Sequence, residues 1–217
     1  MMNLGIETSS KNCSIVLWDD NGNVWSEEQD NDSFVHAERL HEMIDELLNK
    51  AGVAFDQLTR VVVGRGPGSY TGLRIGVSCA KGIAYSMGIP LYSISSLILM
   101  GVEMDVLNAK RDVLLVMDAR RNEVFGGWLR SGTMSEPSPI VFDDSTLMEE
   151  NAPVLILGEN ASKLKSFLRH GDETCDELPS AHAMANPKSE HWFKEEDLAY
   201  FEPQYVKAFV PTTSKKV

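Results

Sequence analysis

The sequence predicts an α/β protein in which helices cover a mixed sheet. Three apolar strand patterns come first, and the turn-forming run Asp19–Gly22 joins the second to the third, which indicates an antiparallel meander. Strands and helices then alternate up to about residue 110, as in parallel βαβ units. The order β-β-β-α-β-α-β-α is typical of a ribonuclease-H-like sheet. Near residue 111 the pattern restarts in a shorter form, so we predict two lobes, 1–110 and 111–217, the second degenerate.

The first half opens with the meander and an amphipathic helix. Its strands are predicted at 4–6, 13–18 and 24–28. A helix from about Phe34 to Ala51 follows, because apolar residues recur there at helical spacing. Asp32 and Ser33 are the candidates for its N-terminal cap. Further elements are predicted as a helical turn at 56–58, a strand at 61–63, a helix at 75–87, a strand at 90–93 and a helix from 96 to about 107.

The second half is predicted with less regular structure. Its strands are expected at 113–118, 123–129, 140–142 and 154–157, and a helix at 161–169. The segment 171–196 is polar and interrupted by Pro179 and Pro187, so no element is predicted there. The last residues, 212–217, are expected to be frayed.

The most informative stretch is the run Gly64–Arg74, at the corner between a buried strand and a helix. Glycine is required where φ is positive or where another backbone comes close, and the N–H groups at a helix start favour anions. The run is not a P-loop, since Leu73 and Arg74 follow Gly72. Nor does it have the dinucleotide-binding spacing, which Pro67 and Ser69 interrupt. A tight structural turn is the alternative to a phosphate site.

The helix after this corner carries small residues at spacing four. Gly72, Gly76, Ala80 and Ala84 share one face. An interior glycine costs a helix roughly 1 kcal/mol relative to alanine, so a close packing contact is expected to compensate. From spacing alone, the stripe fits equally well against the chain's own sheet or against a helix of another subunit.

Catalytic patterns are absent or weak. His36 and His41 are five residues apart, which places them about 140° apart on a helix, whereas metal ligands on one face need spacing three or four. No metal site is therefore predicted. Ser69 has no nucleophile-elbow context and is expected to cap the helix. Glu7, at the end of the first strand, is read as a carboxylate bonded to the facing loop rather than as a catalytic group.

Two further observations concern ligands and compartment. The charged run 118–123 is either a solvated turn or a ligand-facing or interface loop, and the residues leave both alternatives open. The net charge of −12 makes the chain a poor docking surface for nucleic-acid phosphates, so a partner is expected to supply most of the positive surface. Three widely spaced cysteines, no signal peptide and no apolar run of membrane length predict a cytoplasmic protein without membrane contact.

Four motifs together resemble the bacterial TsaB (YeaZ) family, a paralogue of TsaD. The resemblance is strongest over residues 3–130 and weaker from 131 to 200. The motifs are Gly5–Ser9, Gly64–Gly76, Met117–Arg120 and Pro203–Tyr205. The resemblance implies an actin-like ATPase fold. It also implies a role in making threonylcarbamoyladenosine, the modified adenosine beside the anticodon of tRNA. It also implies TsaD and TsaE as partners, a homodimer in their absence and tRNA contact only through the complex. TsaD-type catalysis needs helix histidines at spacing four, which His36 and His41 do not provide.

The resemblance favours a non-catalytic scaffold over an enzyme. No catalytic residue and no cofactor are predicted, and ATP or ADP with magnesium is expected only in the complex. The alternative is a nucleotide hydrolase or an M22-type peptidase, in line with the older "glycoprotease" naming of the family. Residues predicted to meet the partner are Leu40, Ile44, Leu47, Gly72, Leu73, Gly76, Val77, Ala80 and Ala84. Residues predicted to form vestigial phosphate or nucleotide loops are Glu7, Thr8, Ser9, Gly66, Pro67, Gly68 and Ser69.

Overall fold

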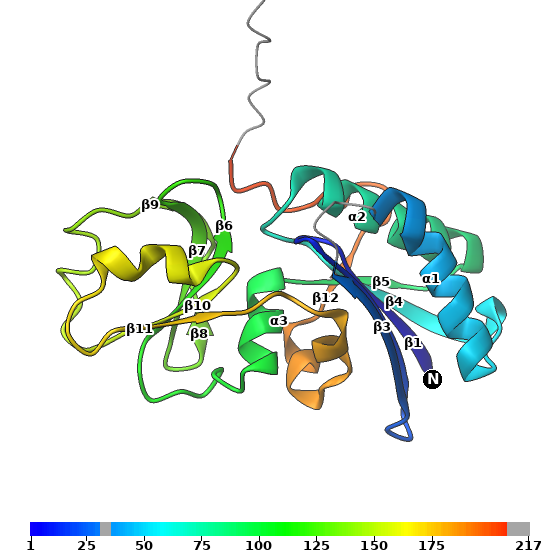
Figure 1. Ribbon diagram of the computed structural model, residues 1–217. Helices are drawn as coiled ribbons and strands as arrows, with labels where there is room; N and C mark the ends of the chain where they lie inside the picture. Colours follow the sequence, from blue (N-terminus) through cyan, green and yellow to red (C-terminus); the bar gives the residue numbers. More distant parts are fainter. Residues whose placement is uncertain (31–35, 208–217) are drawn as a thin grey trace, which may run out of the picture.

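The computed structural model describes residues 1–30 and 36–207, and two mixed sheets organise this part of the chain (Figure 1). The first sheet has the order β12-β5-β4-β1-β2-β3. The second has the order β11-β10-β6-β7-β8, with β9 paired to β7. The α/β class and the restart of the pattern in the second half are confirmed.

The first sheet is built as predicted from a meander followed by parallel strands. Its first strands are β1 (Met2–Glu7), β2 (Asn12–Asp19) and β3 (Val24–Asp30). The parallel strands are β4 (Leu58–Gly64) and β5 (Leu91–Ile94). β1 pairs antiparallel with β2 and parallel with β4, so β1 and β4 end at the same edge of the sheet. Residues at the ends of these two strands therefore lie together.

Helices form a layer on each face of the first sheet (Figure 1). α1 (His36–Ala51) and α2 (Tyr70–Met87) pack on one face and share a core with β1, β2 and β4. α3 (Ser96–Glu103) lies on the other face, in a core that also includes β6 and β10 of the second sheet. No helix within 1–30 and 36–207 is both long and apolar enough to cross a bilayer.

The second sheet carries its own core on its far face. Its strands are β6 (Val113–Asp118), β7 (Glu123–Arg130), β8 (Thr133–Met134), β9 (Ser138–Val141), β10 (Leu155–Gly158) and β11 (Glu173–Asp176). The helix predicted at 161–169 is the 3-10 helix η2 (Ala161–Phe167). Ala161, Leu164 and Phe167 pack into the core at spacing three, which matches the three residues per turn of a 3-10 helix.

Helix boundaries differ from the prediction where polar groups decide them. α2 begins at Tyr70 instead of Ile75, because the Ser69 side chain accepts a hydrogen bond from the N–H of Gly72. α3 ends at Glu103 instead of Leu107. There Asp105 has a φ of 52°, and the N–H of Val106 donates to the carbonyl of Gly101, as in a Schellman cap. The cap candidates Asp32 and Ser33 lie outside the described residues. The predicted turn at 56–58 is η1 (Phe55–Gln57).

The segment 171–196, for which no element was predicted, returns the chain to the first sheet. It contains β11, η3 (Ala181–Ala185), η4 (Pro187–Trp192) and β12 (Lys194–Glu196). β12 pairs antiparallel with β5. Thus residues beyond 111 contribute strands to both sheets. The two sheets do not coincide with the segments 1–110 and 111–217, and the division of the chain into two domains at this point stays a prediction.

Arg60 holds this returning segment in place. Its guanidinium forms two hydrogen bonds with the carboxylate of Glu190, at 2.6 and 2.8 Å. It also lies over the rings of Trp18, Tyr92 and Phe193, 5.3 to 5.7 Å from their centroids. Stacking on aromatic faces together with a bidentate carboxylate contact suits arginine better than lysine.

Candidate functional site

The glycine corner and the end of β1 are packed directly against each other. The N–H of Ser69 donates to the carbonyl oxygen of Ser9 at 2.6 Å. A Cβ on Gly68 would lie 2.2 Å from that same oxygen, so only glycine fits there. The hydroxyl of Thr8 donates to the carbonyl of Gly72 at 2.8 Å. The two segments predicted as separate phosphate loops therefore form one interlocked unit.

Glu7 is enclosed at the centre of this unit. Its side chain is 0% exposed, and a Cβ on Gly64 would lie 1.9 Å from its Oε2 atom. Oε1 accepts the N–H of Ser9 at 2.6 Å, and Oε2 accepts the hydroxyl of Ser96 at 2.8 Å. Burial raises the pKa of Glu7 above its ordinary value, and these hydrogen bonds oppose the rise. The carboxylate is bonded to the facing segments, as the sequence led us to expect.

The polar groups of the predicted phosphate loops are mostly used within the chain. Glu7, Thr8 and Ser9 are all buried. Ser69 caps α2, as predicted, and its own N–H is bonded to Ser9. The Oγ atom of Ser9 is buried and has no hydrogen-bond partner among the residues that the structure describes. A role of Gly66, Pro67 and the neighbouring positions toward a phosphate stays a prediction.

The stripe of small residues faces the interior of this chain and packs against its own sheet. A Cβ on Gly76 would lie 2.2 Å from Oγ1 of Thr8. Ala80 and Ala84 are fully buried against the first sheet. The small side chains let α2 approach β1 and β4 closely, which is the alternative that spacing had left open. The other residues predicted to meet a partner are also buried in this chain: Leu40, Ile44, Leu47, Gly72, Leu73 and Val77.

A different face of the same two helices is open. A hollow of about 450 Å³ lies between α1 and α2 on their outer side. Its lining residues are Ala37, His41, Ile75, Ser78, Cys79, Gly82, Ile83 and Ser86. In the described part of the chain, a Cβ on Gly82 would meet nothing within 4 Å. The sequence signal for this face was present in the third helix glycine, but only the four-residue stripe was singled out.

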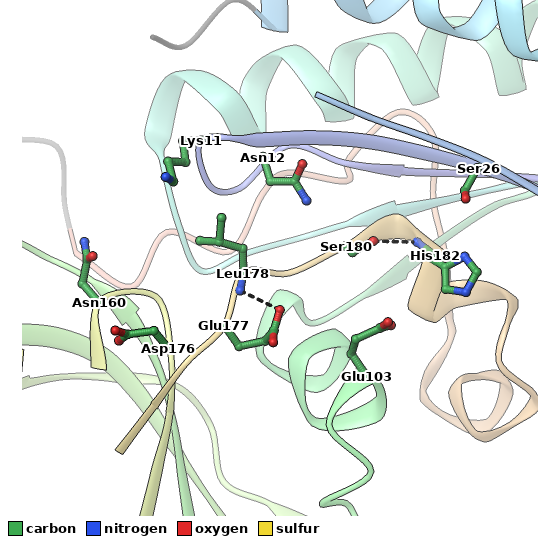
Figure 2. A pocket seen from close by; sticks show the side chains of 10 residues that line it. All are labelled: Lys11, Asn12, Ser26, Glu103, Asn160, Asp176, Glu177, Leu178, Ser180 and His182. Carbon is green, nitrogen blue, oxygen red and sulfur yellow. Dashed lines mark hydrogen bonds between the residues drawn. The ribbon is translucent and has the colours of Figure 1, made fainter. Parts of the chain in front are cut away.

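A larger hollow, with a volume of about 720 Å³, lies between the β1–β2 corner, α3 and the second sheet (Figure 2). Lys11 and Asn12 line one side of it, and Glu103 and Glu177 approach from the other. The Glu177 carboxylate accepts the N–H of Leu178 at 3.1 Å. The lining is polar and carries charges of both signs. Neither spacing nor composition predicted this hollow, because its residues come from five separate segments of the chain.

The charged run 118–123 forms the tip of the β6–β7 hairpin. Burial alone would raise the pKa of Asp118, but hydrogen bonds from Lys163, the N–H of Arg120 and Asn160 lower it overall. The Lys163 ammonium also donates to the carbonyl of Glu123 at 2.8 Å. Burial raises the pKa of Glu159, which accepts the N–H of Asp118 at 3.3 Å. Asp118 therefore links the hairpin tip to the segment that follows β10, through Asn160 and Lys163.

No group of three or more potential metal ligands occurs among residues 1–30 and 36–207. His41 lines the outer hollow of α1 and α2 and is exposed. The side chain of His36 lies outside the described part. The expected lack of a metal site stays a prediction.

Comparisons with known proteins show similarity to a TsaD family model and to TsaB proteins. The model of the TsaD family, described as tRNA N6-adenosine threonylcarbamoyltransferase, matches residues 32–134. TsaB of Haemophilus influenzae is 34% identical over 122 residues, which cover 56% of this chain and 51% of that protein. TsaB of Bacillus subtilis is 36% identical over 143 residues, covering 61% of this chain and 60% of that protein. The matches thus span only about half of these relatives' length. They confirm the resemblance read from the motifs.

Solved structures confirm the fold. YeaZ from Pseudomonas aeruginosa superposes with a TM-score of 0.78 at 23% identity, covering 94% of this chain and 99% of that one. The ethanolamine utilization protein EutJ from Carboxydothermus hydrogenoformans superposes with a TM-score of 0.54 at 9% identity, covering 85% and 89%. The chain has the actin-like ATPase fold that the resemblance implied.

Proposed function

We propose, from the relationship of this chain to the TsaB (YeaZ) proteins, that it is a non-catalytic subunit in threonylcarbamoyladenosine biosynthesis. In this proposal TsaD transfers the threonylcarbamoyl group to the adenosine next to the anticodon, and TsaE assists. The chain supports TsaD by binding it, and forms a homodimer when TsaD is absent. ATP or ADP with magnesium binds only in the assembled complex, and the work takes place in the cytoplasm.

The closed glycine corner supports a non-catalytic role. A general acid or base must reach the proton that it transfers, within hydrogen-bond distance or through one water. Glu7 is 0% exposed, and both of its oxygens are already bonded inside the chain. The loops that would hold a phosphate are bonded to each other through Ser69 and Ser9.

The outer hollow of α1 and α2 is the docking face that we propose for TsaD. Gly82 is the observation that carries this choice. An interior helix glycine costs roughly 1 kcal/mol relative to alanine, and nothing within residues 1–30 and 36–207 requires its small size, because a Cβ there would meet none of their atoms within 4 Å. A partner helix that comes close at this position would require it. Ile75 and Ile83 flank the hollow and are half-buried, so they offer apolar area to such a helix.

The experiment compares substitutions at Gly82 that fold equally well. Gly82→Leu fills the hollow, whereas Gly82→Ala adds one methyl group and serves as the matched small change. Glu46→Leu places the same leucine on an exposed position of α1 outside the hollow. We expect Gly82→Leu alone to abolish both the pull-down of TsaD and the transfer to tRNA reconstituted with TsaD and TsaE. Undiminished binding by a folded Gly82→Leu protein would refute this docking face.

The need for the chain in the reaction is measured by omission. Transfer to tRNA is assayed with TsaD and TsaE, with and without this chain, and we expect little transfer in its absence. Isothermal titration with ATP and magnesium on the isolated chain addresses the alternative of an independent hydrolase. Turnover by the isolated chain that disappears in Glu7→Ala would replace the scaffold by an enzyme.

A further inference from the structure

The tip of the β6–β7 hairpin holds two consecutive arginines in an unfavourable backbone conformation. Arg120 has a φ of 76° and Arg121 a φ of 52°. This left-handed region suits glycine and asparagine, and residues with longer side chains rarely adopt it. A two-residue hairpin turn requires positive φ at both central positions, which asparagine and glycine usually occupy, and residues held in this region cluster at binding and catalytic sites.

Both guanidinium groups are exposed and available. Within residues 1–30 and 36–207, neither the Arg120 nor the Arg121 guanidinium has a hydrogen bond or an ion pair. The neighbouring carboxylate, Asp118, is already bound to Lys163 and Asn160. The hairpin thus presents two unneutralised positive charges on a chain whose net charge is −12.

A narrow slot of about 240 Å³ lies between this hairpin and the glycine corner. Three aromatic side chains line it, Tyr70 from α2, Phe125 from β7 and Tyr205 from the C-terminal segment. The rings of Tyr70 and Tyr205 lie 5.0 Å apart, centroid to centroid. Arg74 fixes this pair, because its Nε donates to the hydroxyl of Tyr205 at 3.1 Å and its guanidinium lies 4.5 Å from the Tyr70 ring centroid.

We propose that this slot binds one unstacked nucleotide of an RNA strand, with its base against the tyrosine rings and its phosphate at Arg120 and Arg121. Aromatic rings beside unpaired arginines are the combination that single-stranded RNA uses, since a base supplies a flat face and the backbone supplies the charge. The volume suits a single base and its sugar. This inference rests on the proposed function, in which the substrate is a tRNA, and adds a direct contact with this chain.

The contact is small, in keeping with the charge of the molecule. A chain with a net charge of −12 is a poor docking surface for a long stretch of phosphates, so in this proposal most of the RNA lies on a basic partner. An acidic peptide would also meet the arginines, but it gains nothing from the paired rings. Competition between RNA and a poly-glutamate peptide therefore separates the two ligands.

The first test removes the charges and relieves the backbone. Arg120→Asn/Arg121→Asn keeps residues that tolerate positive φ, so the thermal midpoint should stay the same or rise. The affinity of the complex with TsaD for the tRNA anticodon stem-loop should fall, and the slope of log K against log salt should shrink by about 0.7 for each phosphate that is no longer neutralised. Lys110→Gln/Arg111→Gln removes two charges elsewhere and should leave that slope unchanged. If both pairs alter binding equally, only net charge matters and the proposal is overturned.

The second test concerns stacking. Tyr205→Phe keeps the ring and should retain RNA binding, whereas Tyr205→Leu should weaken it by roughly 5- to 150-fold, the usual effect of removing the aromatic ring beneath one base. Ultraviolet crosslinking should attach the RNA to Tyr70 or Tyr205. Equal affinity of Tyr205→Leu and wild type, or displacement of the RNA by poly-glutamate but not by a short oligonucleotide, would overturn the inference. If these variants do not change RNA binding and the complex still transfers the threonylcarbamoyl group to tRNA, the RNA slot is refuted and the proposed function stands.

Discussion

The same substitution at two glycines of α2 should have opposite effects on stability. In an exposed helix interior, alanine is preferred over glycine by about 1 kcal/mol. At Gly82 a Cβ meets none of the described atoms within 4 Å, so Gly82→Ala should stabilise the fold by about this amount. At Gly76 the Cβ would lie 2.2 Å from Oγ1 of Thr8 and 3.3 Å from its Cβ and Cγ2. Non-bonded carbon and oxygen atoms do not come within 2.2 Å of each other, so either Thr8 or the helix must move.

The magnitude for Gly76→Ala follows from three contributions. Forcing a methyl group into a packed site costs about 1 to 3 kcal/mol. Moving Thr8 away also breaks its 2.8 Å hydrogen bond to the carbonyl of Gly72, which contributes about 1 kcal/mol. The helix preference of alanine returns about 1 kcal/mol. Gly76→Ala should therefore lower the free energy of unfolding by about 1 to 3 kcal/mol, and the two glycine variants should differ by about 2 to 4 kcal/mol.

Urea unfolding followed by far-ultraviolet circular dichroism measures both variants, with the change in midpoint taken at a constant m-value. Thr8→Ala supplies the test of mechanism, because it removes the hydroxyl and the methyl that the new Cβ would meet. In that background the cost of Gly76→Ala should shrink by about 1 kcal/mol or more, within the usual range of about 0.5 to 3 kcal/mol for coupled neighbours. A stabilising Gly76→Ala, or a cost that is the same with and without Thr8, would refute the packing account of the small-residue stripe.

Three further outcomes follow from the buried groups. Gly64→Ala should prevent folding or move the chain in the interlocked unit, since its Cβ would lie 1.9 Å from Glu7 Oε2, and expression with circular dichroism reports this. The pKa of Glu7 is raised on folding, so its contribution to the free energy of unfolding is most favourable below its unfolded pKa of about 4.5. This contribution is lost as the pH rises through the folded pKa. Glu7→Gln should reduce that loss of stability in unfolding measured from pH 4 to 8. Burial raises the pKa of Cys13 and of Cys79 to about 11, whereas Cys175 is half-buried, so iodoacetamide at pH 8 should label one thiol in the native protein and three in urea, counted by mass spectrometry.

The sequence was sufficient for those elements whose residues follow a local pattern. The runs at 61–63 and 113–118 are apolar and β-branched enough to require a buried strand. The helix predicted at 161–169 is the 3-10 helix η2, and its type was not predicted because apolar positions at spacing three fit both helical periods over seven residues. The glycine corner was recognised for the right physical reason, since Gly68 does permit close approach of another backbone.

Long-range contacts decided what the sequence could not. β12 is a polar strand of three residues with no periodicity to detect. It joins the first sheet with the help of Arg60, which binds the carboxylate of Glu190, 130 positions away in the sequence. The Arg60 guanidinium also lies over the ring of Phe193, the residue before β12. No local signal connects these residues. The division into two lobes was predicted from the restart of the strand pattern near residue 111. Such a pattern does not indicate that a later segment, β12, pairs with a strand of the first sheet.

The two faces of α2 show why a stripe of small residues does not by itself reveal a partner. Gly76 and Gly82 lie about 120° apart on the helix, at about 100° per residue. Thr8 occupies the space that a side chain at position 76 would fill, so contacts within this chain are enough to explain why Gly76 is a glycine. Gly82 has no such neighbour and lines an open hollow beside Ile75 and Ile83. A helix glycine indicates an outside partner only when the chain's own atoms leave its Cβ position empty, and on α2 that condition selects Gly82 and the face it shares with α1.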